Sequence, residues 1–121
     1  MKDQFKIPQA YLETINQVFE IEKKVTQIQE SNSIPRNVNR LKDLIENELF
    51  KSFASNEQSG FVYHNPIGES YTDTRTDCEA TIAGTGVENL VITEVIKPII
   101  FLKQGNFKQM VQKAVVIVES K

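Results

Sequence analysis

The sequence predicts an α+β fold in which two N-terminal helices precede a small β-rich domain of short, mainly antiparallel strands. Up to Phe53, apolar residues recur at steps of three and four, which is the spacing of an amphipathic helix. After Gly60, β-branched and aromatic residues form short runs, separated by turns that contain glycine, proline or asparagine. We therefore expect a helical region over residues 1–57 and a β-domain over residues 58–121.

Length and charge narrow the classes of protein that fit. A chain of 121 residues suits one folding unit with a helical extension. Its 14 Lys and Arg against 16 Asp and Glu give no general attraction to nucleic acid or to anionic membranes. The single cysteine, Cys78, cannot form an internal disulfide and fits a reducing compartment. With no signal peptide and no apolar run of membrane-spanning length, we expect a cytoplasmic protein that binds neither nucleic acid nor membrane.

The first helix is expected over residues 8–30, after Ile7-Pro8. Its apolar side chains form one stripe: Tyr11, Ile15, Val18, Ile21, Val25 and Ile28. Such a stripe can pair with a second copy of the chain, which would make the protein a homodimer. It can equally pack on the second helix or the sheet of its own chain. Because both cases share the same spacing, both interpretations stay open.

The second helix is expected to begin at Pro35, after a polar break, and to run for about 18 residues. Its apolar face is wider than that of the first helix: Val38, Leu41, Leu44, Ile45, Leu49, Phe50 and Phe53. We therefore expect this helix to be the more buried of the two. Residues 54–60 are expected to form a loop.

Strands are expected over residues 61–63, 80–83, 90–96 and 109–119, of which 90–96 is the richest in β-branched residues. Lys97-Pro98 should end that strand, because proline cannot donate to a sheet ladder. Residues 99–102 form either the return of a turn or another strand. Gly84-Thr-Gly86 is expected as a hairpin loop and Gln104-Gly-Asn106 as a turn. The last strand is expected to be continuous, with alternating side chains.

Few residues suggest catalysis. His64 and Cys78 are the only residues of their kinds, and a nucleophilic pair would need them in contact with a third orienting group. Three carboxylates could bind a hard cation: Asp73, Asp77 and Glu79. Arg75, placed among them, offers the simpler explanation of a solvated turn. We expect no enzyme, no cofactor and no metal.

The C-terminal segment is locally basic, with five lysines from Lys97 onward against Glu119 alone. This asymmetry can steer an acidic protein partner, or the lysines can protect exposed strand edges from aggregation. Phe101 and Phe107 flank the turn at Gly105. Aromatic side chains beside lysines would suit a binding tip, or they belong to the core.

Four segments of the second half, taken in order, resemble the β-domain of GrpE-type nucleotide exchange factors. They are Pro66-Ile-Gly-Glu-Ser-Tyr71, Glu79-Ala80, Val91-Ile-Thr-Glu-Val-Ile-Lys-Pro98 and Lys113-Ala-Val-Val-Ile-Val118. The resemblance runs from Val38 to Val118, about two-thirds of the chain. Cys78 stands where the family has histidine, Ile99-Ile100 replaces its Gly-Tyr, its arginine before the last strand is missing, and the N-terminal helix is much shorter.

The resemblance implies a non-enzymatic co-chaperone whose partner is the ATPase domain of an Hsp70-type chaperone. It would bind the open nucleotide cleft more tightly and so speed ADP release. The family's contacts, carried over position by position, fall near Ile96, Lys108 and Val118, and the basic tip adds Lys97 and Phe107. Two alternatives are a divergent adaptor with a GrpE-like β-domain but no exchange activity, and a small cation-dependent or thiol enzyme.

Overall fold

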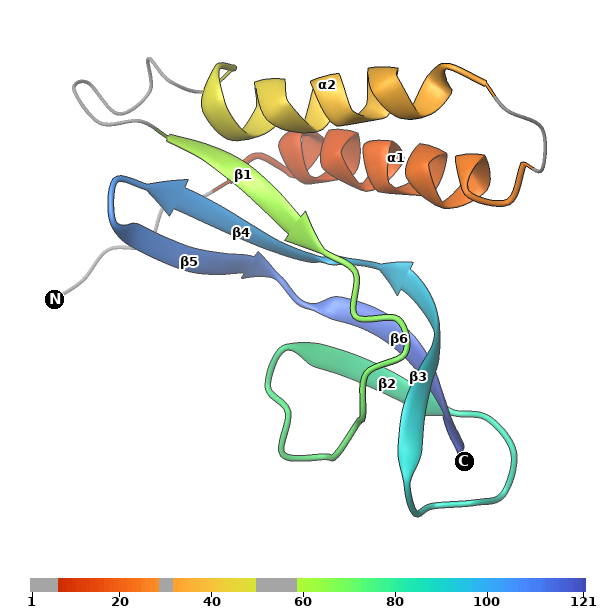
Figure 1. Ribbon diagram of the computed structural model, residues 1–121. Helices are drawn as coiled ribbons and strands as arrows, with labels where there is room; N and C mark the ends of the chain where they lie inside the picture. Colours follow the sequence, from red (N-terminus) through yellow and green to blue (C-terminus); the bar gives the residue numbers. More distant parts are fainter. Residues whose placement is uncertain (1–6, 29–31, 50–58) are drawn as a thin grey trace, which may run out of the picture.

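The computed structural model describes residues 7–28, 32–49 and 59–121. In this part, two helices are followed by six short strands in two three-stranded sheets, which is the α+β fold that the sequence predicts (Figure 1). The helices are α1 (Gln9–Val25) and α2 (Ile34–Asn47). The strands are β1 (Ser59–His64), β2 (Cys78–Ile82), β3 (Leu90–Lys97), β4 (Ile99–Gln104), β5 (Phe107–Gln112) and β6 (Ala114–Ser120).

Both helices are shorter than the apolar spacing alone predicts. α1 begins after Pro8, and its regular hydrogen bonding ends at Val25, where Lys23 and Lys24 suit the negative end of the helix dipole. α2 has a proline in its first turn and ends at Asn47. The expected extension of α2 to residue 53 lies partly outside the described residues. Neither described helix is long and apolar enough to cross a membrane.

The two sheets share one long, bent antiparallel ribbon. Sheet A has the strand order β1-β4-β5, and sheet B has the order β2-β6-β3. One arm of the ribbon is β3 followed by β4, and the other is β5 followed by β6. The single strand expected over residues 109–119 is therefore wrong, because it is two strands in different sheets. It breaks at Lys113, beside the point where Pro98 interrupts the facing arm.

Side chains hold the ribbon at this bend. Pro98 has no N–H for the ladder, and its carbonyl accepts a hydrogen bond from the Gln112 side-chain amide at 2.9 Å. Gln112 also exchanges two hydrogen bonds with the Asn16 side chain of α1, at 2.9 and 3.1 Å. A proline and two amides thus turn one extended segment into two strands.

The outer strands complete each sheet. β1 adds to β4 antiparallel, and β2 adds to β6 parallel. Because β6 lies between β2 and β3, the segment at Gly84-Thr-Gly86 crosses the end of sheet B, and the expectation of a hairpin loop there is wrong. Residues 68–71 also join sheet B, through three backbone hydrogen bonds of 2.8–2.9 Å to residues 90–92. β3 is therefore bonded on both of its sides.

Two clusters of buried side chains form the core. The first lies between the helices and sheet A: Ile15, Val18, Val38, Ile45, Phe61, Ile100 and Leu102. The second fills sheet B and its junction with sheet A: Phe19, Cys78, Ile92, Val95, Ile99, Ala114, Val116 and Val118. In α1, Val18 belongs to the first cluster and Phe19 to the second, so this helix packs against both sheets. The boundary expected at residues 57 and 58 lies outside the described residues, and the first cluster joins side chains from both sides of it.

Candidate functional site

The five side chains predicted to bind a partner do not form one surface. Ile96 and Lys97 are exposed at the end of β3, whereas Phe107 and Lys108 are exposed at the start of β5. These two pairs lie at opposite ends of β4 (Figure 1). Val118 is fully buried in the second cluster, so a partner cannot touch its side chain while the core is closed. Alternation along β6 turns it inward.

The two exposed pairs also have different surroundings. Lys97 lines a shallow hollow beside the polar face of α1, together with Glu13 and Gln17. Phe107 and Lys108 are successive residues of one strand, so their side chains point to opposite faces of sheet A. Lys108 lies on the same face of sheet A as its cross-strand partner Lys103, and Phe107 lies on the opposite face.

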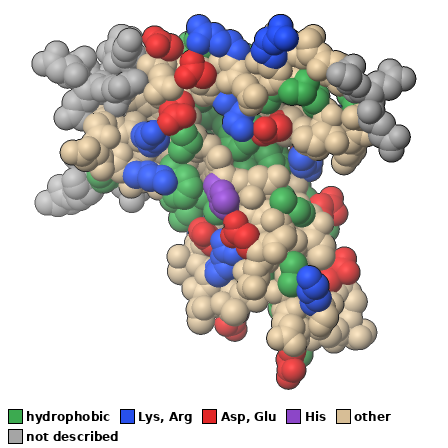
Figure 2. All heavy atoms as spheres, in the orientation of Figure 1, with side chains coloured by type: hydrophobic (Ala, Val, Ile, Leu, Met, Phe, Trp, Pro, Cys, Tyr) green, Lys and Arg blue, Asp and Glu red, His purple; other side chains and the backbone are tan. Residues whose placement is uncertain are grey.

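Around Lys108 the structure assembles a basic and apolar surface that the sequence predicts only in part. Its members are on three strands: Val62, Phe101, Lys103, Lys108 and Met110, here called the outer face of sheet A. The Lys108 ammonium lies 4.4 Å from the centroid of the Phe101 ring, which is a cation–π contact. In Figure 2, Lys or Arg side chains adjoin hydrophobic ones close to the single histidine.

The two lysines of this face are direct cross-strand partners, an arrangement in which like charges repel. Lys103 is offset by Glu46 of α2, whose carboxylate lies 2.6 Å from its ammonium. Lys108 has no ion-pair partner in the described part of the chain. An acidic group on another molecule would relieve this repulsion, so the outer face of sheet A suits an acidic partner.

The turn with the Pro-x-Gly-Glu motif has its own local explanation. Glu69 N–H donates to the carbonyl of Pro66 at 3.1 Å, which closes a four-residue turn. The third residue, Gly68, has φ of +85°, as a type II turn requires. The Asn65 side chain accepts a hydrogen bond from Ile67 N–H at 3.1 Å and fixes the entry to the turn. The side chain of Ile67 is left half exposed at the tip.

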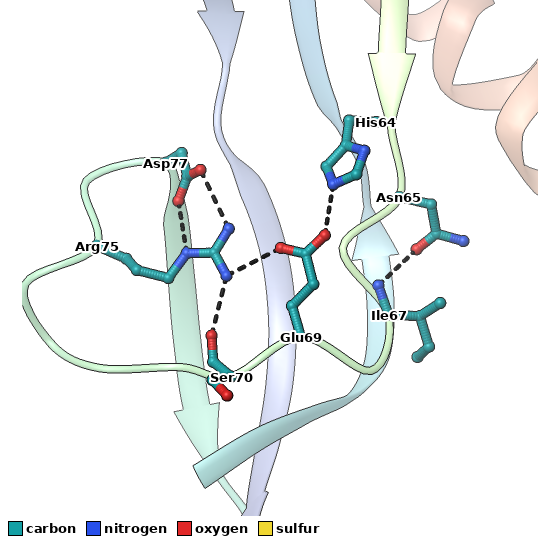
Figure 3. Close-up of polar contacts among 7 residues, drawn as sticks. All are labelled: His64, Asn65, Ile67, Glu69, Ser70, Arg75 and Asp77. Carbon is teal, nitrogen blue, oxygen red and sulfur yellow. Dashed lines mark hydrogen bonds and ion pairs between the residues drawn. The ribbon is translucent and has the colours of Figure 1, made fainter.

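Four charged side chains tie this turn to the sheets: His64, Glu69, Arg75 and Asp77, here called the ionic cluster (Figure 3). Arg75 donates to both carboxylate oxygens of Asp77, at 3.0 and 3.1 Å. It also lies 3.1 Å from one oxygen of Glu69 and donates to the carbonyl of Ser70 at 3.0 Å. The other Glu69 oxygen lies 2.6 Å from His64 Nε2. The cluster joins the end of β1, the turn and the residue before β2.

These contacts keep the acids ionised. The hydrogen bonds from Arg75 lower the pKa of Asp77, although its partial burial acts in the opposite direction. Burial would raise the pKa of Glu69, but hydrogen bonds from His64 and Arg75 outweigh it and lower that pKa. The pairing of Asp77 with Arg75 favours the solvated-turn interpretation over a cation site. Among the described residues, no three His, Cys, Asp or Glu side chains gather as metal ligands.

The residues considered for a thiol nucleophile have structural roles. Cys78 is buried in the second cluster, and this burial raises the pKa of its thiol to about 11. The thiol therefore stays protonated near neutral pH, whereas a nucleophilic cysteine must be a thiolate. His64 is held by Glu69 through Nε2.

The apolar stripe of α1 is largely used within the chain. Ile15, Val18 and Val25 are buried, and Tyr11 packs half-buried against the first cluster. The intramolecular interpretation thus accounts for most of the six residues named for a dimer. Only the other two are largely exposed, Ile21 at 43% and Ile28 at 47%, and α2 adds Ile34 and Leu41 at 40% each.

Comparisons of this chain with models of protein families, with curated proteins and with solved structures found no match.

Proposed function

We propose that this chain is a non-enzymatic co-chaperone of the GrpE type, which binds the nucleotide domain of an Hsp70-type ATPase and promotes ADP release. One observation carries the proposal. The four segments that resemble GrpE proteins are dispersed along the sequence, yet they adjoin one another in sheet B. Residues 68–71 pair with β3, and both β3 and β2 pair with β6. Matches that assemble into one folded unit support the resemblance more than any single match does.

The proposed contacts are the exposed residues Ile96, Lys97, Phe107 and Lys108, supported by the outer face of sheet A. Lys108 contributes a cation without an ion-pair partner in the described chain, beside the half-buried ring of Phe101. A basic and aromatic surface steers an acidic patch on the partner and then excludes water from the contact. Val118 is not a direct contact in this proposal, because its side chain is fully buried in the second cluster, within sheet B.

The proposed mechanism involves no covalent chemistry. The ATPase domain exchanges between a closed and an open nucleotide cleft, and ADP is released from the open one. A protein that binds the open state more tightly raises its population and therefore the rate of release. The packing of α1 against both core clusters supports this role, since a wedge must hold its shape against the partner.

A second candidate is an adaptor with the same β-domain and no exchange activity. The separation of the two exposed pairs along β4 favours it, because a wedge on one lobe needs a continuous contact. We further propose that the protein acts in the cytoplasm, where a lone buried cysteine stays reduced. A homodimer, if formed through the helices, would use Ile21, Ile28, Ile34 and Leu41.

The test is the release rate of a fluorescent ADP analogue from a bacterial Hsp70, measured by stopped flow with and without the chain. We expect acceleration, and we expect Lys108→Glu to reduce it at least tenfold. Lys24→Glu is the matched control, because Lys24 is an exposed lysine of α1 outside the proposed contact. An unchanged release rate at concentrations well above micromolar would reject exchange activity and favour the adaptor.

A further inference from the structure

Sheet B ends, on the side away from the helices, in an open groove. Its volume is about 460 Å³. One wall is the segment from Tyr71 to Asp73, the other is β2 at Ala80 and Ile82, and residues 87–90 close the end. No part of the proposed Hsp70 contact lies in it.

The groove is lined by both apolar and polar residues, and some of its apolar side chains are open to water. Val87 is 71% exposed and Ile82 is 45% exposed. Tyr71, Ala80 and Leu90 are half-buried and pack against the second core cluster. Single exposed apolar side chains are normal on a protein surface, but several that meet in one concavity mark a binding site. The groove is therefore continuous with the second core cluster, and a large aliphatic side chain of another molecule can fill it.

One wall of the groove also offers backbone hydrogen bonds. β2 is paired with β6 on one side and with no other strand in the described part of the chain. An unpaired strand edge is a template for an added strand, and peptides use such edges in many complexes. An extended segment along β2 would place every second side chain over the groove.

The charges around the groove are mainly acidic, with one cation close by: the exposed Lys121, whose backbone N–H donates to the carbonyl of Asn89 in the groove lining at 3.0 Å. Asp73 lies in the wall, Glu88 follows Val87, and Glu79 is on the outer side of β2. All three carboxylates are exposed, and none has an ion-pair partner among residues 7–28, 32–49 and 59–121. The nearby Arg75 is already bound to Asp77 and Glu69. A partner segment that carries Lys or Arg would complement this surface.

We propose that this groove docks an extended segment of a partner protein, added as a strand along β2, with a large aliphatic side chain flanked by basic residues. The aliphatic side chain fills the space between Tyr71, Ile82 and Val87, and the flanking cations face Asp73 and Glu88. This site is separate from the outer face of sheet A, which is basic and suits an acidic partner. One molecule could therefore hold two partners of opposite charge at once.

The test uses the full chain and three fluorescein-labelled peptides of eight residues. The first has two lysines at each end and four alternating valines and leucines between them. The second has glutamates in place of the lysines, and the third has serines in place of the aliphatic residues. By fluorescence anisotropy we expect the first peptide to bind at least tenfold more tightly than either of the others. In ¹H–¹⁵N spectra, its addition should shift the amides of residues 71–73, 79–83 and 87–90.

Variants separate the apolar and the charged contributions. Val87→Lys changes a side chain that is 71% exposed, so folding should be preserved while affinity for the first peptide falls at least tenfold. Asp73→Lys should lower the affinity for the first peptide about fivefold. It should also reduce the difference in affinity between the basic and the acidic peptide. The control is Ile67→Lys, which alters a half-exposed aliphatic residue outside the groove and should change nothing.

Three results would overturn the proposal: no saturable binding at millimolar peptide, equal affinity for basic and acidic peptides, or amide shifts that map elsewhere. Self-association of the chain that Val87→Lys abolishes would assign the groove to a second copy instead. Each of these results leaves ADP release from Hsp70 unaffected, so failure here is distinguishable from failure of the proposed function.

Discussion

Replacing Arg75 by glutamine should destabilise the protein by about 2 kcal/mol. The side chain makes two hydrogen bonds to Asp77, one to Ser70 and an ion pair with Glu69. A buried hydrogen bond to a charged group contributes about 1.5–3 kcal/mol, whereas an exposed ion pair contributes about 0–1 kcal/mol. Arg75 is 21% exposed and its two carboxylate partners are 35% and 37% exposed, so each contact should contribute within the exposed-pair range, about 0.5 kcal/mol, and the four contacts together about 2 kcal/mol.

Urea unfolding followed by circular dichroism measures this change. With a slope of about 2 kcal/mol per molar urea, the midpoint should fall by about 1 M. Arg40→Gln is the matched control, because Arg40 makes one ion pair with Asp43, at 65% and 48% exposure, and should lose at most about 0.5 kcal/mol. Equal midpoints for the two variants would refute the structural role of the ionic cluster.

Three further predictions follow from packing, backbone geometry and charge. Gly60→Ala should lower the free energy of unfolding in urea by about 3 kcal/mol, because its Cβ would clash with the backbone oxygen of Glu46 in α2. Gly68→Ala, where only the φ of +85° is strained, should lower it by about 1–2 kcal/mol. Ile15→Ala should lower the free energy of unfolding by about 2–5 kcal/mol because it leaves a cavity in the core, whereas Ile21→Ala should lower it by less than about 1 kcal/mol. Similar losses in these two variants would contradict the intramolecular packing of α1. Folding lowers the pKa of both carboxylates in the ionic cluster, so their contribution to stability is complete above their ordinary pKa values of 4.5 and 3.8 and is lost as pH falls through the lower folded values. The difference in free energy of unfolding between wild type and Arg75→Gln should therefore become smaller below about pH 4.

Much of the fold follows from local patterns in the sequence. The steps of three and four in the first 49 residues give both helices. The expectation that the second helix is the more buried one is wrong, because α1 buries four side chains, whereas the buried side chains of α2 are Val38 and Ile45 and its Leu41 is 40% exposed. The β-branched run at residues 90–96 gives β3, and Pro98 ends it as expected. Arg75 among three acids gives the ion pair with Asp77. Each of these features depends on neighbours close in the sequence.

The errors arise where distant residues decide the outcome. The break of the last strand at Lys113 depends on Pro98 and Gln112, and the inward position of Val118 depends on the sheet around it. The spacing of the apolar stripe on α1 fits a dimer and packing within the chain equally well, and only the presence of sheet A decides between them. The outer face of sheet A depends on the register of three strands, which no local spacing encodes. The aromatic residues that flank the turn at Gly105, in a segment rich in lysine, are the sequence feature that points to this face.

The most direct test of the central claim compares the affinity of this chain for an Hsp70 ATPase domain without nucleotide and with saturating ADP. Thermodynamic linkage requires that, if this protein lowers the affinity of the ATPase domain for ADP, ADP lowers the affinity of the domain for this protein by the same factor. We predict at least tenfold tighter binding to the nucleotide-free domain. Equal affinities for the two states would contradict the claim, because a ligand that binds both states equally shifts neither.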